Sequence, residues 1–310
     1  DEAIDAIERV AHLSKADLTT KMVIEFTELQ GVIGEIYALK SGEKDIVATA
    51  IREQYLPKFA GDALPESSVG SIFSLADKID TIAGLFAIGE IPTGSTDPFA
   101  LRRSAIGVIN IIRNNSWKLD LNEAVEASLY EYINDLGLTF NHEEVIENVR
   151  DFFFGRIKTM LQEEGIRYDI IDSVLIPESE IHNIFDKTNE LNEWFNEDRS
   201  KFVDAYNRIN NLTKNVDFLE INEELFKEDA EKDLYNKFVE IDNKFKEAIS
   251  SENYKESMDL LNELVPAIDV FFDNVMVMDE DEKVRENRLG LINSIEENIQ
   301  KILKIENIVE

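Results

Sequence analysis

The chain has 310 residues, a length that suggests two domains. Its composition, 44% hydrophobic and 31% charged, is typical of a folded globular protein, and the absence of cysteine excludes disulfides and thiolate zinc sites. The net charge of −32 argues against nucleic acid as a partner, because phosphate binding relies on lysine and arginine, although a local basic patch can still bind RNA.

No segment approaches the roughly 18 consecutive apolar residues of a membrane-spanning helix, so we expect no membrane partner. The lack of cysteine fits a reducing compartment, and we expect a cytoplasmic protein. The chain begins with Asp1 rather than Met, so we expect it to be part of a longer protein.

The N-terminal part is expected to be helical. Residues 4–13 continue a helix, and residues 21–40 carry apolar side chains at helical spacing. Gly31 and Gly34 fall inside the second segment, where each costs about 1 kcal/mol relative to alanine, so we expect a neighbouring element to approach closely there. A short helix over residues 46–56 stops at Pro57, and Ser67 or Ser68 is expected to cap the next helix.

Residues 77–112 predict a helix, a glycine-rich turn and a second helix. The first helix has an apolar stripe at helical spacing, and the turn contains Gly89, Pro92 and Gly94. Asp97 is the expected N-cap of the second helix, with Pro98 as its first residue. This second helix is apolar almost all round, so we expect it in the middle of a bundle.

Four charged residues in this stretch admit two interpretations. Asp77 and Asp80 lie one turn apart, and Arg102 and Arg103 lie early in the next helix, where the backbone dipole disfavours cations. Either these charges form an internal network that fixes the turn, or they face a partner outside the fold.

The remaining segments are also helical in pattern. Two amphipathic helices follow over about residues 121–136 and 145–161, and a short helical segment ends at Pro177, where we place a domain boundary. Three long periodic stretches follow, over residues 184–212, 234–249 and 281–302, with an apolar segment interrupted by Pro266 before the last. No strand-like alternation is present, so the predicted class is all-α.

Signals of catalytic chemistry are few. The three histidines, His12, His142 and His182, share no ligand spacing, and no nucleotide-binding or hydrolase motif is present. The N-terminal half does resemble the HD phosphohydrolase superfamily, which binds divalent metal: Lys15-Ala16-Asp17 stands where its His-Asp pair lies, and Ser74–Lys78 is similar to its later aspartate segment. Asp17 and Asp77 are then vestigial metal ligands without imidazoles, and such a site holds Mg²⁺ or Mn²⁺ weakly.

A second resemblance covers nearly the whole chain. Four long, collinear segments resemble the β subunit of bacterial heterotetrameric glycyl-tRNA synthetases: KADL with MVIEFTELQG, ADKIDTIAGLFAIG with IPTGSTDPFALRR, GIRYDIIDSVL, and the segment from LVPAIDVFF to LGLINSI. The resemblance implies an HD-like helical domain over residues 1–118, connecting helices over 119–178 and a helical-bundle anticodon-binding domain over 179–310. Residues 181–254 carry no motif of the family and match only in helical character.

The family also implies a function. The whole enzyme joins glycine to tRNA(Gly) with ATP and Mg²⁺, the α subunit carries out the chemistry, and the β subunit binds tRNA and α in an α2β2 assembly. This chain is then expected to bind no cofactor itself, to have no catalytic residue, and to act as a tRNA-binding part of the ligase.

Five residues are the predicted RNA contacts. Arg285, Asn287 and Arg288 lie close together on the last helix, and guanidinium and carboxamide groups suit phosphates and unpaired bases. Arg102 and Arg103 are candidates for the tRNA acceptor arm. For Arg285 and Arg288, pairing with nearby carboxylates is an equally open interpretation.

Two other functions stay open at this point. One is a metal-dependent HD-type nucleotide phosphohydrolase, against which the missing imidazoles count. The other is a helical scaffold that binds only protein, which the acidity of the chain would suit.

Overall fold

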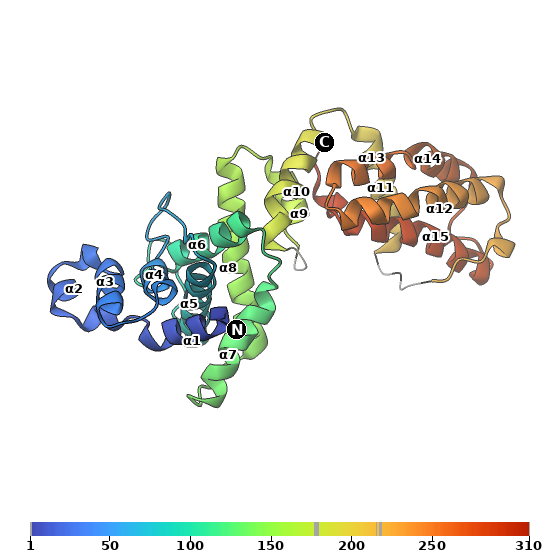
Figure 1. The fold of residues 1–310 in the computed structure, drawn as a ribbon. Coiled ribbons are helices and arrows are strands. Elements are labelled where there is room, and N and C mark those ends of the chain that lie inside the picture. Colours follow the sequence, from blue (N-terminus) through green and yellow to red (C-terminus); the bar gives the residue numbers. More distant parts are fainter. Residues whose placement is uncertain (1, 177–179, 215, 217–218, 310) are drawn as a thin grey trace. The chain divides into compact units, whose positions relative to one another are not determined.

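A computed structural model describes residues 2–176, 180–214, 216 and 219–309 (Figure 1). These residues form α-helices and short 3₁₀ helices without a β-sheet, which confirms the all-α class. Within the described residues no helix is both long and apolar enough to cross a lipid bilayer. The expected boundary at Pro177 lies outside the described residues.

The chain divides into two compact units, and the first comprises Asp1–Thr159 with Glu180–His182. The predicted connecting region therefore contributes to both units, and the three-domain division stays a prediction. The elements up to the end of the first unit are α1 (Glu2–Leu13), η1 (Ala16–Thr19), α2 (Lys21–Glu25), η2 (Thr27–Leu29), α3 (Val32–Lys40), α4 (Asp45–Glu53), α5 (Ser68–Ala87), α6 (Leu101–Asn115), α7 (Leu121–Asn134) and α8 (His142–Glu163), whose last turn belongs to the second unit.

Helices α5 and α6 form the centre of the first unit and pack against each other. Ser67 caps α5 by accepting a hydrogen bond from Gly70 N at 3.0 Å, as predicted. The predicted start of α6 is wrong: the helix begins at Leu101, because Ala100 adopts a left-handed conformation with φ 57°. Asp97 still caps the helix, since its carboxylate accepts hydrogen bonds from the N–H groups of Leu101 and Arg102.

The single helix predicted over residues 21–40 is also wrong, because the chain breaks it into α2, η2 and α3. Gly31 stands at the N-cap of α3 with φ 85°, a conformation that glycine adopts without strain. The close approach is confirmed. A Cβ on Gly31 would lie 2.9 Å from the Tyr55 ring, and one on Gly34 would lie 2.8 Å from Cγ2 of Ile51.

The second unit comprises Met160–Ser179 and Asn183–Glu310. The remaining elements are α9 (Tyr168–Val174), α10 (Ile181–Trp194), α11 (Ser200–Thr213), η3 (Glu223–Leu225), α12 (Asp229–Ser250), α13 (Tyr254–Asn262), α14 (Val265–Asn274), α15 (Glu282–Gln300) and η4 (Ile305–Asn307). The periodic stretch over residues 184–212 is thus two helices. The chain turns between them, where Asp198 accepts a hydrogen bond from Ser200 N and the Arg199 guanidinium lies 4.1 Å from the Trp194 ring centre.

Candidate nucleic-acid interface

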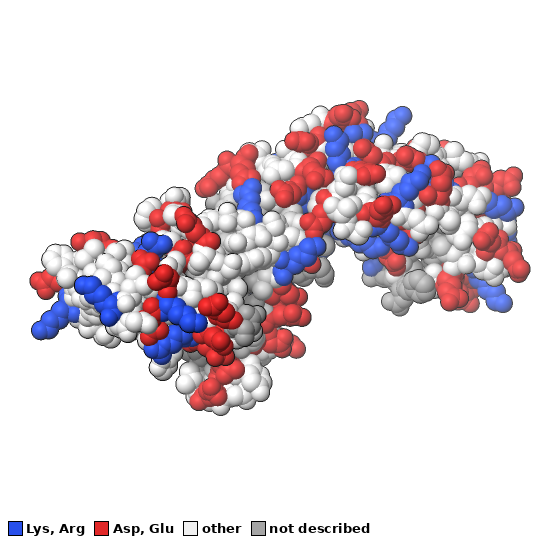
Figure 2. Space-filling model, viewed as in Figure 1, with Lys and Arg blue, Asp and Glu red and all other residues white. Residues whose placement is uncertain are grey.

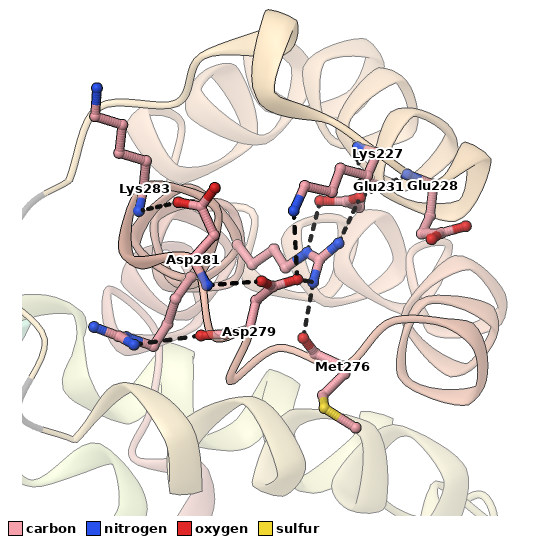
Figure 3. A network of polar contacts seen from close by, with 9 residues as sticks. Lys227, Glu228, Glu231, Met276, Asp279, Asp281 and Lys283 are labelled. Carbon is pink, nitrogen blue, oxygen red and sulfur yellow. Dashed lines mark hydrogen bonds and ion pairs between the residues drawn. The ribbon is translucent and has the colours of Figure 1, made fainter.

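A network of polar contacts surrounds Arg288 in the first half of α15 (Figure 3). Its Nε and Nη2 donate to the two carboxylate oxygens of Glu231 on α12, at 2.9 and 3.2 Å. Its Nη1 donates to Met276 O and to Asp279 Oδ2, both at 2.9 Å. The Arg288 side chain is 4% exposed and that of Glu231 is 0% exposed. The guanidinium therefore joins α12, α15 and the loop before α15 from inside the bundle.

Glu231 receives further hydrogen bonds from the backbone N–H groups of Lys227 and Glu228, at 2.9 and 2.8 Å. Burial acts to raise the pKa of Glu231, but the hydrogen bonds from Arg288 and from these backbone groups outweigh it and hold the pKa below its ordinary value. The carboxylate is therefore charged in the folded protein at neutral pH, and it is a fixed partner for Arg288.

Asn287 also has a structural role. Asn287 is 2% exposed, and its Oδ1 accepts a hydrogen bond from Asn222 N at 2.6 Å. Nδ2 is buried with no hydrogen-bond partner among the described residues. For Asn287 and Arg288, the structure thus favours the structural interpretation over direct contact with RNA, because neither side chain reaches the surface.

Arg285 differs from Arg288 although it lies one turn away. Its side chain is 31% exposed, and its nearest carboxylate is that of Glu282 at 3.6 Å. Nη1 donates to Asp279 O at 3.3 Å, which positions the guanidinium without neutralising it. Arg285 is the one predicted contact on α15 that an RNA phosphate can reach in the described part of the chain.

Two exposed residues around the Arg288 network carried no signal in the sequence. Lys227 comes from the segment before α12; its side chain is 50% exposed, and its Nζ lies 3.8 Å from Asp279 Oδ2. Met276, in the loop before α15, is 76% exposed. The sequence could not have assigned them, because only the packing of α12 against α15 brings Lys227 to Asp279 (Figure 3).

The charges around the turn before α6 pair differently from either interpretation of the sequence. Asp77 pairs with Lys15 at 2.6 Å, and Asp80 accepts a hydrogen bond from the Tyr132 hydroxyl at 3.1 Å. Arg102 donates to Gly94 O at 2.9 Å, and Arg103 is exposed. The two acidic side chains thus bind other groups of the protein, whereas the two arginine side chains are accessible to solvent.

A third arginine lies near Arg102. Arg156 on α8 is half-buried against the Phe152 ring, with the guanidinium carbon 5.5 Å from the ring centre. Burial and, to a smaller extent, the positive charge of Arg102 lower the pKa of Arg156, whereas the negative charge of Asp97 acts in the opposite direction. Arg156 is therefore a partly buried cation close to both Arg102 and the Asp97 carboxylate.

The two vestigial metal ligands bind protein groups. Asp17 is 4% exposed and accepts hydrogen bonds from Gly31 N and from the Tyr55 hydroxyl, each at 2.7 Å. The Asp77 carboxylate forms an ion pair with the Lys15 ammonium. No group of three or more His, Cys, Asp or Glu side chains in the described residues is arranged to hold a metal ion. The structure therefore gives both carboxylates a structural use.

Comparison with known proteins identifies the family. A model of the glycyl-tRNA synthetase beta subunit matches residues 1–176, and a model of the DALR anticodon-binding domain matches residues 179–309. The chain belongs to the glycyl-tRNA synthetase β-subunit family.

Relatives named "Glycine--tRNA ligase beta subunit" match over nearly the whole chain. The protein of Clostridioides difficile is 43% identical over 100% of this chain, and that of Halalkalibacterium halodurans is 40% identical over 94%. These matches cover 45% and 43% of the two relatives. The chain thus spans less than half the length of the relatives that it matches.

The surface of this family member is mixed in charge. On the face shown in Figure 2, acidic side chains are spread over both units, and lysine and arginine side chains are scattered among them. No continuous basic strip is visible on that face. Any RNA contact on that face has to be made by individual accessible cations rather than by a broad positive surface.

Proposed function

We propose that this chain is the tRNA-binding, non-catalytic portion of the β subunit of a cytoplasmic glycine–tRNA ligase. The match of the anticodon-binding domain to residues 179–309 carries the proposal. The ligase joins glycine to tRNA(Gly) with ATP and Mg²⁺, and the α subunit of an α2β2 assembly forms the adenylate and transfers glycine. This chain contributes affinity for the tRNA and for the α subunit.

The exposure of the cations on α15 supports the division of roles proposed for the second unit. Arg285 and the exposed Lys283 bind phosphates or unpaired bases, while Arg288 and Asn287 hold α15 in place from the interior. In the first unit, Arg102 and Arg103 bind the acceptor arm. Because each cation neutralises about one phosphate, each alanine substitution lowers the salt dependence of binding by about one unit of slope.

The experiment is a filter-binding titration of tRNA(Gly) at several salt concentrations, with unrelated RNA in excess. Arg285→Ala is compared with Lys244→Ala, which removes a cation of 62% exposure from α12. We expect weaker tRNA binding and a smaller salt slope for Arg285→Ala alone. Equal affinity and slope for Arg285→Ala, Arg102→Ala, Arg103→Ala and the unchanged protein would refute the assignment.

One surface of the first unit suits a protein partner better than RNA. Large apolar side chains are exposed on η1, α2 and α3 and at Phe26 between α2 and η2, with exposed fractions of 66% for Ile24, 48% for Phe26 and 45% for Leu39. Exposed apolar clusters of this kind mark protein interfaces. This surface supports association with the α subunit, and co-elution of the α subunit with Ile24→Ser or Phe26→Ser measures it: undiminished co-elution excludes this surface.

A further inference from the structure

The first unit contains a pocket of about 390 Å³ that the vestigial metal site does not use and that shares only Arg103 with the proposed RNA contacts. It lies between α6 and the loop over residues 57–64. Its volume falls in the usual range for small-molecule sites, about 300–1,000 Å³. Both walls come from the first unit, so the pocket is complete within that unit.

The α6 wall carries positive charge and carboxamide groups beside the apolar Ile106 and Gly107. Arg103 and Arg113 line its two ends, and Asn110 and Asn114 line it between and beside them. Ten residues of α-helix span about 15 Å, so the two arginines are far enough apart to receive different parts of one ligand. A guanidinium group binds phosphate oxygens in pairs, and a carboxamide offers both a donor and an acceptor to the edge of a base.

The opposite wall offers an aromatic ring. Phe59 lines the pocket and is 59% exposed, and Pro57 and Leu64 complete an apolar surface beside it. An exposed phenylalanine ring loses contact with water when a planar base stacks on it, and such stacking is worth about 1–3 kcal/mol per base. The ring therefore supplies what the arginines lack, which is affinity for the uncharged part of a ligand.

The loop that carries Phe59 is held in place before any ligand binds. Asp62 accepts hydrogen bonds from Lys58 N and Ala63 N, at 2.7 and 2.9 Å, so the one carboxylate lining the pocket is used by the loop itself. At the start of the loop, Leu56 O accepts from the buried Lys78 ammonium at 2.9 Å. A preorganised wall lowers the entropic cost of binding.

We propose that this pocket binds a nucleoside phosphate. The phosphate lies against Arg103, the base stacks on Phe59, and Asn110 or Asn114 contacts the base edge. A protein of net charge −32 repels anions over most of its surface. The pocket differs from that surface because two arginines line it. The pocket goes beyond the proposed RNA-binding function; the two share Arg103, so the pocket is tested at residues that are not proposed RNA contacts.

The test is calorimetric titration of the whole chain with AMP, ADP, adenosine and inorganic phosphate. We expect ADP to bind at one site with a dissociation constant below about 1 mM, and adenosine or phosphate alone to bind at least about tenfold more weakly. Phe59→Ala and Asn114→Ala are the test variants. Phe99→Ala is the matched control for the first, because Phe99 is 50% exposed in another loop. Asn115→Ala is the control for the second, because Asn115 bonds Ile111 O.

The proposal predicts at least about a tenfold loss of ADP affinity in each test variant and none in its control. No binding of AMP or ADP at about 1 mM, equal binding of adenosine, or equal losses in the controls would overturn it. A short single-stranded RNA that displaces ADP identifies an RNA terminus as the source of the nucleoside phosphate, and failure to displace it identifies a free nucleotide. Because tRNA binding is measured separately with Arg285→Ala, failure here leaves the proposed function standing.

Discussion

Removal of Arg288 should destabilise the second unit far more than it weakens RNA binding. Arg288→Ala deletes four hydrogen bonds and leaves the Glu231 carboxylate, with a side chain 0% exposed, buried without its counter-charge. Breaking a buried ion pair on one side costs about 3–5 kcal/mol. With a urea dependence of about 2 kcal/mol per molar, the unfolding midpoint should fall by about 1.5–2.5 M.

Tryptophan fluorescence can report this unit alone. The chain has two tryptophans, and Trp194 is 2% exposed in the second unit. In a Trp117→Phe background, Trp194 follows urea unfolding of that unit. The double variant Arg288→Met/Glu231→Leu serves as the control, because removing both partners leaves no buried charge and should cost less than Arg288→Ala alone.

The pH dependence provides a second check. The pKa of Glu231 is lowered in the folded state, so the contribution of the pair to stability is complete above the ordinary value of 4.5 and is lost as the pH falls below it. The reasoning is refuted if Arg288→Ala lowers stability by less than about 1 kcal/mol. It is also refuted if this variant loses tRNA affinity while its urea midpoint is unchanged.

Three further substitutions test other parts of the structure. Burial raises the pKa of Glu296 from 4.5 to about 7, so the free energy of unfolding should decrease by up to about 3 kcal/mol as the pH rises between these values. Urea titrations at pH 5 and pH 8 measure this decrease, and Glu296→Gln should remove it. In thermal unfolding, Gly31→Ala should lower the free energy of unfolding by about 1–3 kcal/mol more than Gly42→Ala. Both glycines have positive φ, but only Gly31 has atoms within 4 Å of the added Cβ, so equal losses of stability would contradict this packing. Asp17→Ala should lower the free energy of unfolding by about 2–3 kcal/mol, because Gly31 N and the Tyr55 hydroxyl lose their acceptor. EDTA should leave the melting temperature of the unchanged chain as it is, and a lower melting temperature with EDTA would indicate a bound metal.

The sequence determined the features that depend on neighbours along the chain. Apolar spacing predicted the all-α class, the cap of α5 was narrowed to Ser67 or Ser68, and long collinear motifs placed the chain in its family. Its errors lay where a local conformation interrupted a continuous pattern. The positive φ of Gly31 and of Ala100 displaced the ends of two predicted helices, because periodicity does not report a single left-handed residue.

Tertiary structure alone decided the roles of the charged residues. Arg285 and Arg288 lie one turn apart on α15, yet one is accessible and the other is buried against a carboxylate 57 positions away in the sequence. In the same way, Asp77 pairs with Lys15 rather than with an arginine of α6. Charge pairing depends on distances across the fold, and a pattern along one helix gives no measure of those distances.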